Sequence, residues 1–308
     1  MCTYNGEAFI REQLDSILGQ TQLPSEIIIC DDRSTDRTLS ILREYESQNQ
    51  QISWKIHENA QNLGWRRNFR ECICMASGDV VFLCDQDDIW DPHKIEVFVK
   101  AFAENDHIEL LYSDYRPLIM KGAQETRLQS HSKNTKQVEK IDLVPSGFYY
   151  HVGCTYAFRW DLIKYFILCW NHTCAHDNIL WYVALAMESL YHIDYEAIHF
   201  RRHGGNASST GFKKISRSAR DATYSEVLQH LEIIRGILQN VPITEDSRML
   251  LGKMENWLIV RRALYEKRSV LDFIRLFRYR TYYSSFLNYA REINAIIYKS
   301  RGENGTAK

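Results

Sequence analysis

Short apolar runs and amphipathic stretches alternate along the first third of the chain. Between residues 7 and 20, apolar side chains such as Ile10 and Leu14 recur at helical spacing, which predicts an amphipathic helix. The run at 26–30 is short and apolar, as expected for a buried strand. The same reasoning predicts further elements, namely helices at 34–49, 64–76 and 92–105 and strands at 52–57, 80–84 and 109–114. This repeated alternation predicts an α/β fold with a doubly wound, mostly parallel sheet.

The pattern changes beyond the last of these strands. Residues 115–143 are polar and weakly patterned, which indicates a loop that covers the ligand site described below. Helices are expected at 161–169 and 176–188, and short strands at 191–201. From about residue 208 the chain has helical periodicity without strand signals. We therefore expect two regions, an α/β domain at 1–207 and a helical C-terminal region at 208–308.

Two of the predicted strands end in carboxylates. Asp31 and Asp32 follow the run at 26–30, and the segment Asp85-Gln86-Asp87-Asp88 follows the run at 80–84. In open α/β sheets, ligands bind at the carboxyl ends of the strands. Crowded carboxylates there are costly unless a cation neutralises them, and Mg²⁺ or Mn²⁺ prefers such oxygen ligands and binds phosphates as well. The pattern indicates a metal that holds a diphosphate, with a solvated acidic turn as the alternative.

Composition and charge exclude several classes of function. The formal net charge is -1, which gives no electrostatic basis for binding nucleic acid. The longest apolar stretch, 179–187, is about half the length that a membrane-spanning helix needs. With no export signal evident after Met1, the eight cysteines indicate a reducing cytosol. Four candidate zinc ligands lie within eight residues, namely Cys169, His172, Cys174 and His176. Their spacing matches no common zinc pattern.

Several motifs, taken in order, resemble glycosyltransferase family 2. The similarity is greatest to the bacterial rhamnosyltransferase-like members that build O-antigen, capsule or exopolysaccharide, and it covers roughly residues 1–210. It rests on Cys2-Thr3-Tyr4-Asn5-Gly6, Asp31-Asp32-Arg33-Ser34-Thr35-Asp36, Asn62-Leu63-Gly64 with Asn68-Phe69, Asp85-Gln86-Asp87-Asp88, Gly153-Cys154-Thr155, His176-Asp177 and Arg202-His203-Gly204-Gly205-Asn206.

The resemblance implies a GT-A fold and inverting transfer of a sugar from a UDP- or dTDP-linked donor to a saccharide or lipid-linked acceptor. It assigns the donor site to Thr3, Tyr4, Asn5, Asp31, Asp32, Asn68, Asp85 and His203. Within that site, Asp85, Asp87 and His203 would meet Mg²⁺ or Mn²⁺ and the diphosphate. Asp177 would be the general base that takes the proton of the acceptor hydroxyl, which is a role suited to a carboxylate.

One departure from the family concerns the first strand. Members usually have a hydrophobic strand before the Cys2-Thr3-Tyr4-Asn5-Gly6 motif, whereas here only Met1 precedes it. We expect either a start upstream of Met1 or a truncated first strand. Two other functions remain as alternatives. A sugar nucleotidyltransferase would usually begin with a glycine-rich phosphate loop, which is not evident here, and a catalytically inactive nucleotide-sugar-binding protein would keep the pocket alone.

The C-terminal helical region is rich in basic and aromatic residues. Residues 261–301 contain ten Lys or Arg and three acids. The basic residues are Arg261, Arg262, Lys267, Arg268, Arg275, Arg278, Arg280, Arg291, Lys299 and Arg301. Basic residues beside an apolar aromatic face suit a helix that lies on an anionic membrane surface. We therefore expect a cytoplasmic protein in peripheral contact with the inner face of the cell membrane. A helical cap on the α/β domain, or a dimer contact, is the alternative.

Overall fold

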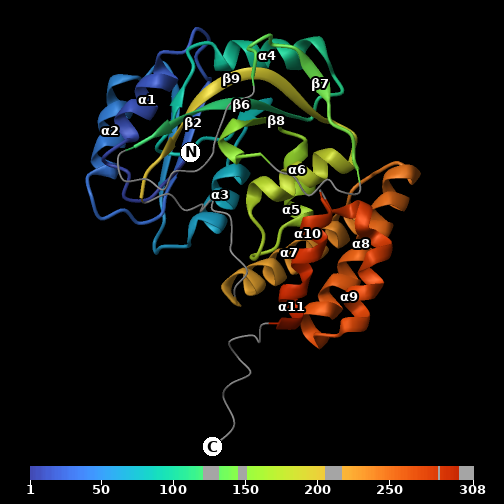
Figure 1. The fold of residues 1–308 in the computed structure, drawn as a ribbon. Coiled ribbons are helices and arrows are strands. Elements are labelled where there is room, and N and C mark those ends of the chain that lie inside the picture. The colour runs from blue at the N-terminus through green and yellow to red at the C-terminus, as the bar shows by residue number, and fades with distance from the viewer. Residues whose placement is uncertain (121–131, 145–150, 205–216, 284, 298–308) are drawn as a thin grey trace, which may run out of the picture.

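Two β-sheets lie side by side in the N-terminal two-thirds of the computed structural model, and helices cover them (Figure 1). The structure describes residues 1–120, 132–144, 151–204, 217–283 and 285–297. The first sheet is parallel throughout and has the order β1 (Cys2–Thr3), β2 (Glu26–Asp31) and β3 (Ser53–Glu58). The second sheet has the order β4 (Val80–Phe82), β8 (Tyr156–Arg159), β6 (Leu110–Ile119), β9 (Leu190–Arg202) and β5 (Ile89–Trp90), with β7 (Val138–Lys140) beside β9.

Strand pairing in the second sheet is mixed. β6 and β9 run parallel, whereas β4 with β8, β6 with β8, β5 with β9 and β7 with β9 are antiparallel. The prediction for 80–84 was therefore wrong in one respect, because β4 has an antiparallel neighbour, not a parallel one. The expected loop at 115–143 begins later than predicted, since β6 continues to Ile119. The short strands expected at 191–201 are a single strand of 13 residues.

Helices from residues 1–186 pack on the two sheets, and the remaining helices extend away from them (Figure 1). The first group comprises α1 (Ile10–Leu18), α2 (Thr38–Gln48), α3 (Trp65–Cys74), α4 (Lys94–Glu104), α5 (Leu162–Cys169) and α6 (His176–Ala186), with the short η1 (Gly153–Thr155). The second group comprises α7 (Arg217–Asn240), α8 (Glu245–Lys267), α9 (Val270–Leu276), η2 (Phe277–Tyr282), α10 (Phe286–Ala290), η3 (Arg291–Ile293) and α11 (Asn294–Ile297).

A single apolar cluster joins the second sheet to the C-terminal helices. It includes Phe158 on β8, Phe166 on α5, Leu231 on α7 and Trp257 on α8, all of them buried. The C-terminal helices thus share a core with the helices that cover the sheet. Within the described residues, no helix combines the length and apolar character that crossing a bilayer requires. Of the residues named in the sequence analysis, Gly205, Asn206, Lys299 and Arg301 lie outside the described residues.

The first strand of the parallel sheet is short. β1 pairs with only the last part of β2, at Cys30 and Asp31. Ahead of it, the Met1 amine donates a hydrogen bond to the Ile28 carbonyl at 2.8 Å. A cavity of about 380 Å³ lies beside this point, lined by residues of β2, β4 and α3. The cavity lies between β2 of the first sheet and β4 of the second.

Candidate functional site

The two carboxylates that end β2 are buried and fully hydrogen-bonded by the protein. Asp31 accepts hydrogen bonds from the Thr3 hydroxyl at 2.7 Å and from the backbone and hydroxyl of Ser34 at 2.8 and 2.6 Å. Asp32 accepts three more, from the side-chain amide of Asn59 and from two backbone N–H groups, those of Leu63 and Gly64. We call Asp31 and Asp32 the network carboxylates. They fix the position of both loops that border this end of the sheet.

The loop after β1 is held against the same network. Asn5 has a left-handed backbone with φ of 48°, and its side-chain oxygen accepts a hydrogen bond from the Thr35 backbone at 2.8 Å. Asn68 is buried, donates to the Cys30 carbonyl and accepts from Asn59, both at 2.8 Å. Tyr4, by contrast, exposes half of its surface. Among the predicted donor residues in this part of the site, Tyr4 and Asn5 are exposed, and Thr3, Asp31, Asp32 and Asn68 are buried.

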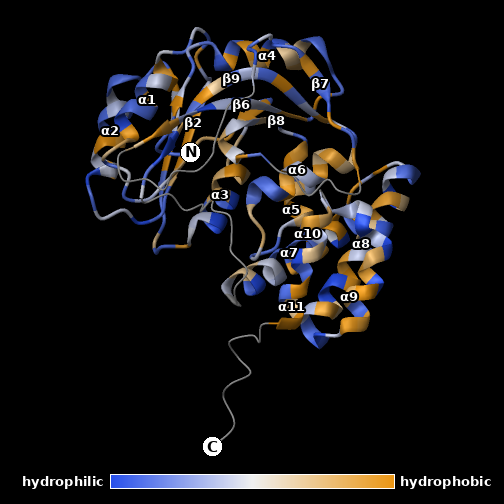
Figure 2. Cartoon of the chain, viewed as in Figure 1, coloured by the Kyte–Doolittle hydropathy of each residue, from blue (hydrophilic) through white to orange (hydrophobic). Residues whose placement is uncertain are grey.

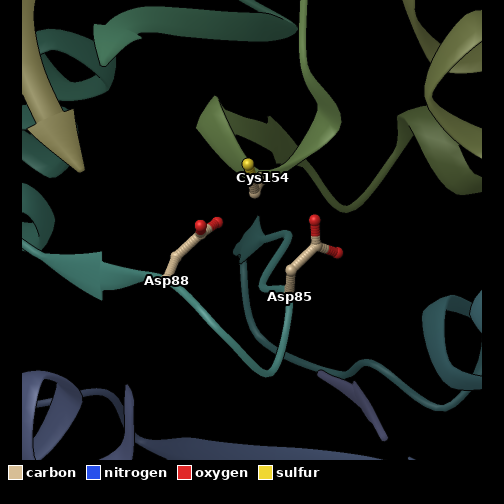
Figure 3. Close-up of side chains that lie close together, drawn as sticks. All are labelled: Asp85, Asp88 and Cys154. Atoms are coloured by element: carbon tan, nitrogen blue, oxygen red, sulfur yellow. The ribbon is translucent and has the colours of Figure 1, made fainter. Parts of the chain in front are cut away.

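A second group of carboxylates follows β4 and lacks such a network. Asp85 and Asp88 lie across a loop from each other, and both point toward Cys154 (Figure 3); ligand atoms of the three residues lie within 4.8 Å of one another. Asp88 is buried, and its Oδ1 accepts the Arg201 backbone N–H at 2.9 Å. In the part of the chain that the structure describes, no N–H or O–H group donates to its Oδ2.

Burial and mutual repulsion act on this second group together. Burial raises the pKa of Asp85 well above its usual value, and the negative charges of Asp88, Asp87 and Asp177 raise it further. Burial, with the charge of Asp87, also raises the pKa of Asp88 to about 7. We call Asp85, Asp87 and Asp88 the crowded carboxylates. Ionising all of them together is unfavourable unless a cation is present.

Asp87 lies beside the predicted histidine from the far end of the domain. Its Oδ2 is 2.7 Å from Nε2 of His203, which follows β9, and the His203 ring packs on Phe9 with centroids 4.6 Å apart. Arg201 holds the loop in place from the same strand, since its Nε donates to the Asp87 carbonyl at 2.7 Å and its guanidinium pairs with Glu12. β9 thus brings His203 to the acids over a sequence distance of more than a hundred residues.

The chemistry of this group fits a hard divalent cation. Asp85, Asp87 and Asp88 supply oxygen atoms, and His203 adds a nitrogen beside Asp87. The third member of the Asp85 and Asp88 cluster is the thiol of Cys154, which is a poorer ligand than the carboxylates because a hard cation prefers oxygen to sulfur. The buried Oδ2 of Asp88 has no hydrogen-bond partner among the described residues. This is the clearest sign that a bound group from outside the protein completes the site.

Asp177 faces the crowded carboxylates from the other side, at the start of α6. Its negative charge is one of the causes that raise the pKa of Asp85. Gly153 packs directly against it, because a Cβ at Gly153 would lie 2.8 Å from the Cβ of Asp177. The preceding residue, His176, is buried and stacks on Phe69 with ring centroids 3.9 Å apart. This stacking and the close glycine fix the direction in which Asp177 points.

The glycosyl transferase family 2 model matches residues 1–165 of the chain. The chain belongs to this family. Its predicted glycosyltransferase identity and its GT-A-type α/β fold, with helices at the C-terminus, are thus confirmed.

Relatives of this glycosyltransferase include proteins with and without an assigned activity. An uncharacterized protein of Mycobacterium tuberculosis is 35% identical over 126 residues, which are 40% of this chain and 36% of that protein, so the chain spans about a third of that relative. An uncharacterized glycosyltransferase of Haemophilus influenzae is 26% identical and covers 96% of this chain and 97% of its own. The dTDP-rhamnosyl transferase RfbG of Shigella flexneri is 28% identical over 67% of this chain and 72% of its own.

Solved structures share the fold of this glycosyltransferase at low sequence identity. S. aureus TarS in complex with UDP-GlcNAc aligns with a TM-score of 0.64 at 18% identity, over 96% of this chain and 87% of that one. The mannosyltransferase PcManGT from Pyrobaculum calidifontis, in complex with GDP-Man and Mn²⁺, aligns with a TM-score of 0.51 at 17% identity, over 96% and 84%.

Three residues of the candidate site were not predicted from the sequence. Gln86 bonds both backbone groups of Tyr4, accepting from its N–H at 2.9 Å and donating to its carbonyl at 3.1 Å. Lys94 is completely buried, donates to the Cys154 carbonyl at 3.0 Å and lies over the ring of Trp90. Arg201 is the third. The acids on either side of Gln86 form a recognisable sequence motif. The contacts of Lys94 and Arg201 depend on tertiary structure, so no motif indicates them.

The zinc site considered from the sequence does not form among the described residues. Cys169 packs against Gly236 of α7, and Cys174 donates to the Gln229 carbonyl. His176 is stacked on Phe69 instead of facing either thiol. Both cysteines are buried, and burial raises the pKa of each thiol. These residues are therefore part of the apolar contact between α5, α6 and α7.

Proposed function

We propose that this glycosyltransferase is an inverting enzyme that moves a sugar from a UDP- or dTDP-linked donor to a saccharide or lipid-linked acceptor. Its place would be the synthesis of bacterial surface polysaccharide on the cytoplasmic side of the membrane. Residues 1–207 would form the catalytic domain. The observation that carries this proposal is the cluster of Asp85, Asp87, Asp88 and His203, whose loop Gln86 joins to Tyr4 by two hydrogen bonds.

The donor would lie across the end of the two sheets. We place its nucleoside beside Tyr4 and the network carboxylates, where Thr3, Asn5 and Asn68 hold the loops in position. The diphosphate would then reach the crowded carboxylates and His203. A bound Mg²⁺ or Mn²⁺ would stabilise the negative charge of the leaving diphosphate. The hydrogen-bonded network would hold the nucleoside of such a donor. The crowded carboxylates would hold the cation that binds its diphosphate.

Asp177 would act on the acceptor. Inversion in a single displacement requires a base on the face of the sugar opposite the leaving group. Asp177 lies across from the loop of Asp85 and is held by Gly153 and by the stacked His176. It would accept the proton of the acceptor hydroxyl as the new bond to the sugar forms, which typically accelerates a reaction by about 10²–10⁴-fold.

The identity of the donor sugar is the part of this proposal that a binding screen tests best. RfbG is named a dTDP-rhamnosyl transferase, and TarS was solved with UDP-GlcNAc, so both nucleotides are plausible starting points. Thermal shift with Mn²⁺ and a panel of UDP-, dTDP- and GDP-sugars should identify one stabilising donor. Release of the nucleotide should then rise when an acceptor is added. Stabilisation by a donor without release under any condition would favour an inactive binding protein, and release of pyrophosphate from a nucleoside triphosphate would favour a nucleotidyltransferase.

A further inference from the structure

The C-terminal helices expose an apolar surface that nothing in the described chain covers. Leu271 and Ile274 on α9 expose 65% and 60% of their surface, and Leu287 on α10 exposes 70%. Figure 2 shows hydrophobic residues along α9 and α11, at the end of the helical region away from the sheets. We call the following residues the C-terminal apolar surface: Val270, Leu271, Ile274, Phe277, Phe286 and Leu287.

This surface is continuous across two helices. Val270, Ile274 and Phe277 follow the i, i+4, i+7 spacing, so they lie along one face of α9. Phe277 and Phe286 each pack on the buried ring of Tyr289, with centroids 5.9 and 5.7 Å away. The end of α9 and the start of α10 are therefore neighbours, and their exposed side chains form one patch.

Within residues 269–297, the exposed charged side chains are all basic. Between residues 269 and 297 the sequence has two acids, Asp272 and Glu292, and both are buried. Arg275 pairs with Asp272 at 2.8 Å, and Arg261 pairs with Glu292 at 2.5 Å. The acids of this segment thus face inward and are neutralised there, and they leave no negative charge on its surface.

The arginines, by contrast, are exposed beside the most exposed apolar residues. Arg275 follows Leu271 by one helical turn, Arg278 follows Ile274, and Arg291 follows Leu287. Arg280 adds a fourth exposed cation, stacked on Phe277 at 5.2 Å. A protein partner with an apolar face would not by itself require these exposed arginines, of which Arg275 also pairs with Asp272. A surface with an apolar interior and anionic head groups matches both features.

We propose that the C-terminal apolar surface docks this glycosyltransferase on an anionic lipid bilayer. The apolar side chains would enter the boundary between head groups and acyl chains, and Arg275, Arg278, Arg280 and Arg291 would contact the anionic head groups. The docking is peripheral and depends on neither donor nor acceptor. It would hold the catalytic domain at the place where a lipid-linked acceptor is found.

Vesicle flotation of the purified full chain, without donor or acceptor, tests the proposal. Vesicles of phosphatidylcholine alone are compared with vesicles that also contain phosphatidylglycerol. We expect binding to the anionic vesicles only, and weaker binding at high salt. The triple variant Arg278→Gln, Arg280→Gln, Arg291→Gln should lose roughly fivefold in partition for each arginine. The triple variant Leu271→Gln, Ile274→Gln, Leu287→Gln should lose binding as well.

Matched variants control for general changes in charge and hydrophobicity. Arg37→Gln, Arg43→Gln, Lys100→Gln makes the same change in net charge on the helices over the sheets, and Ile167→Gln, Leu168→Gln, Met249→Gln removes exposed apolar residues elsewhere. Both controls should bind like the parent chain, and an unchanged melting temperature shows that each variant is folded. Equal binding to both kinds of vesicle, or to neither, would overturn the proposal. So would self-association through the patch, measured by light scattering, in a chain that does not bind vesicles.

Discussion

The carboxylates after β2 and those after β4 differ in what neutralises them. The network carboxylates, Asp31 and Asp32, accept six hydrogen bonds from hydroxyl, amide and backbone groups. At the end of the neighbouring sheet, Asp88 is buried and Asp85 and Asp87 are half-buried, yet Asp88 receives one backbone hydrogen bond and repels Asp85 and Asp87. Aspartates at the same edge of the fold are thus well hydrogen-bonded after β2 and repel one another after β4.

This difference separates a preformed part of the site from a part that a ligand must complete. A hydrogen bond to a charged group contributes about 1.5–3 kcal/mol to stability, so the network carboxylates hold the fold together with or without a donor. Buried acids that repel each other weaken the fold until a cation binds. If this view is correct, substitutions in the two groups should differ in their effects on both activity and stability.

Removal of the metal should have the largest effect. EDTA is expected to abolish sugar transfer, and Asp87→Asn should lower donor affinity and turnover together, because a metal at a leaving group is worth several kcal/mol. Nucleotide release measured with Mn²⁺, with Mg²⁺ and with EDTA checks this expectation. Full activity in EDTA would show that transfer does not require a metal. The repulsion among the crowded carboxylates would then have no functional explanation.

Loss of the proposed base should follow in size. Asp177→Asn is expected to reduce transfer by at least about 10²-fold while donor binding is kept, since only the acceptor's proton transfer is affected. Transfer kinetics together with donor titration by calorimetry separate these two effects. Gly153→Ala is the companion variant, because its Cβ would press on Asp177, and it should lower transfer in the same way. A loss of donor affinity in Asp177→Asn would instead place Asp177 in the donor site.

Stability should change in opposite directions in the two groups. Asp32→Asn is expected to cost about 2 kcal/mol or more, because its new amide group would face the backbone N–H groups of Leu63 and Gly64. Asp88→Asn should leave the metal-free protein equally stable or slightly more stable, since it removes a buried charge next to Asp87. Urea unfolding of both variants in EDTA measures this. A large destabilisation by Asp88→Asn would show that the crowded carboxylates are already compensated.

The sequence predicted those parts of the structure that depend on local patterns. Helical spacing and short apolar runs located α1, β2 and α4, and the acids after β2 and β4 marked the edge of the sheet where a ligand would bind. The antiparallel pairing of β4 could not be predicted, because β8 has only four residues and gives little periodic signal.

The candidate site divides in the same way. The family motifs named Asp87 and His203, and the structure brings these two together, which no motif in the sequence could show. Gln86 and Lys94 could not be recognised, because their importance comes from Tyr4 and Cys154, which are far away in the sequence. The motifs also could not distinguish a residue that meets a ligand from one such as Asn68, whose side chain bonds the protein itself.

A pH dependence specific to Asp88 should be smaller but diagnostic. Burial and the charge of Asp87 raise its pKa in the folded protein to about 7, from 3.8. Protonated Asp88 is therefore favoured by folding, so its contribution to stability is full below about pH 4 and is lost as the pH rises through 7. Relative to Asp88→Asn, the melting temperature of the metal-free parent chain should fall between pH 5 and pH 8. Saturating Mn²⁺ should remove the difference, and a constant difference across this range would contradict the assignment.

The smallest effect is expected where the two regions meet. Gln86 bonds both backbone groups of Tyr4, so it links the loop of the crowded carboxylates to the loop beside the network carboxylates. Gln86→Ala would lose these two hydrogen bonds, which are exposed and worth about 1 kcal/mol together, and should raise the donor KM severalfold with a smaller change in kcat. Gln86→Glu is the sharper test, because it keeps the size of the side chain and one acceptor but cannot donate to the Tyr4 carbonyl. If both variants bind the donor like the parent chain, the preformed and the ligand-dependent parts of the site are positioned independently of each other.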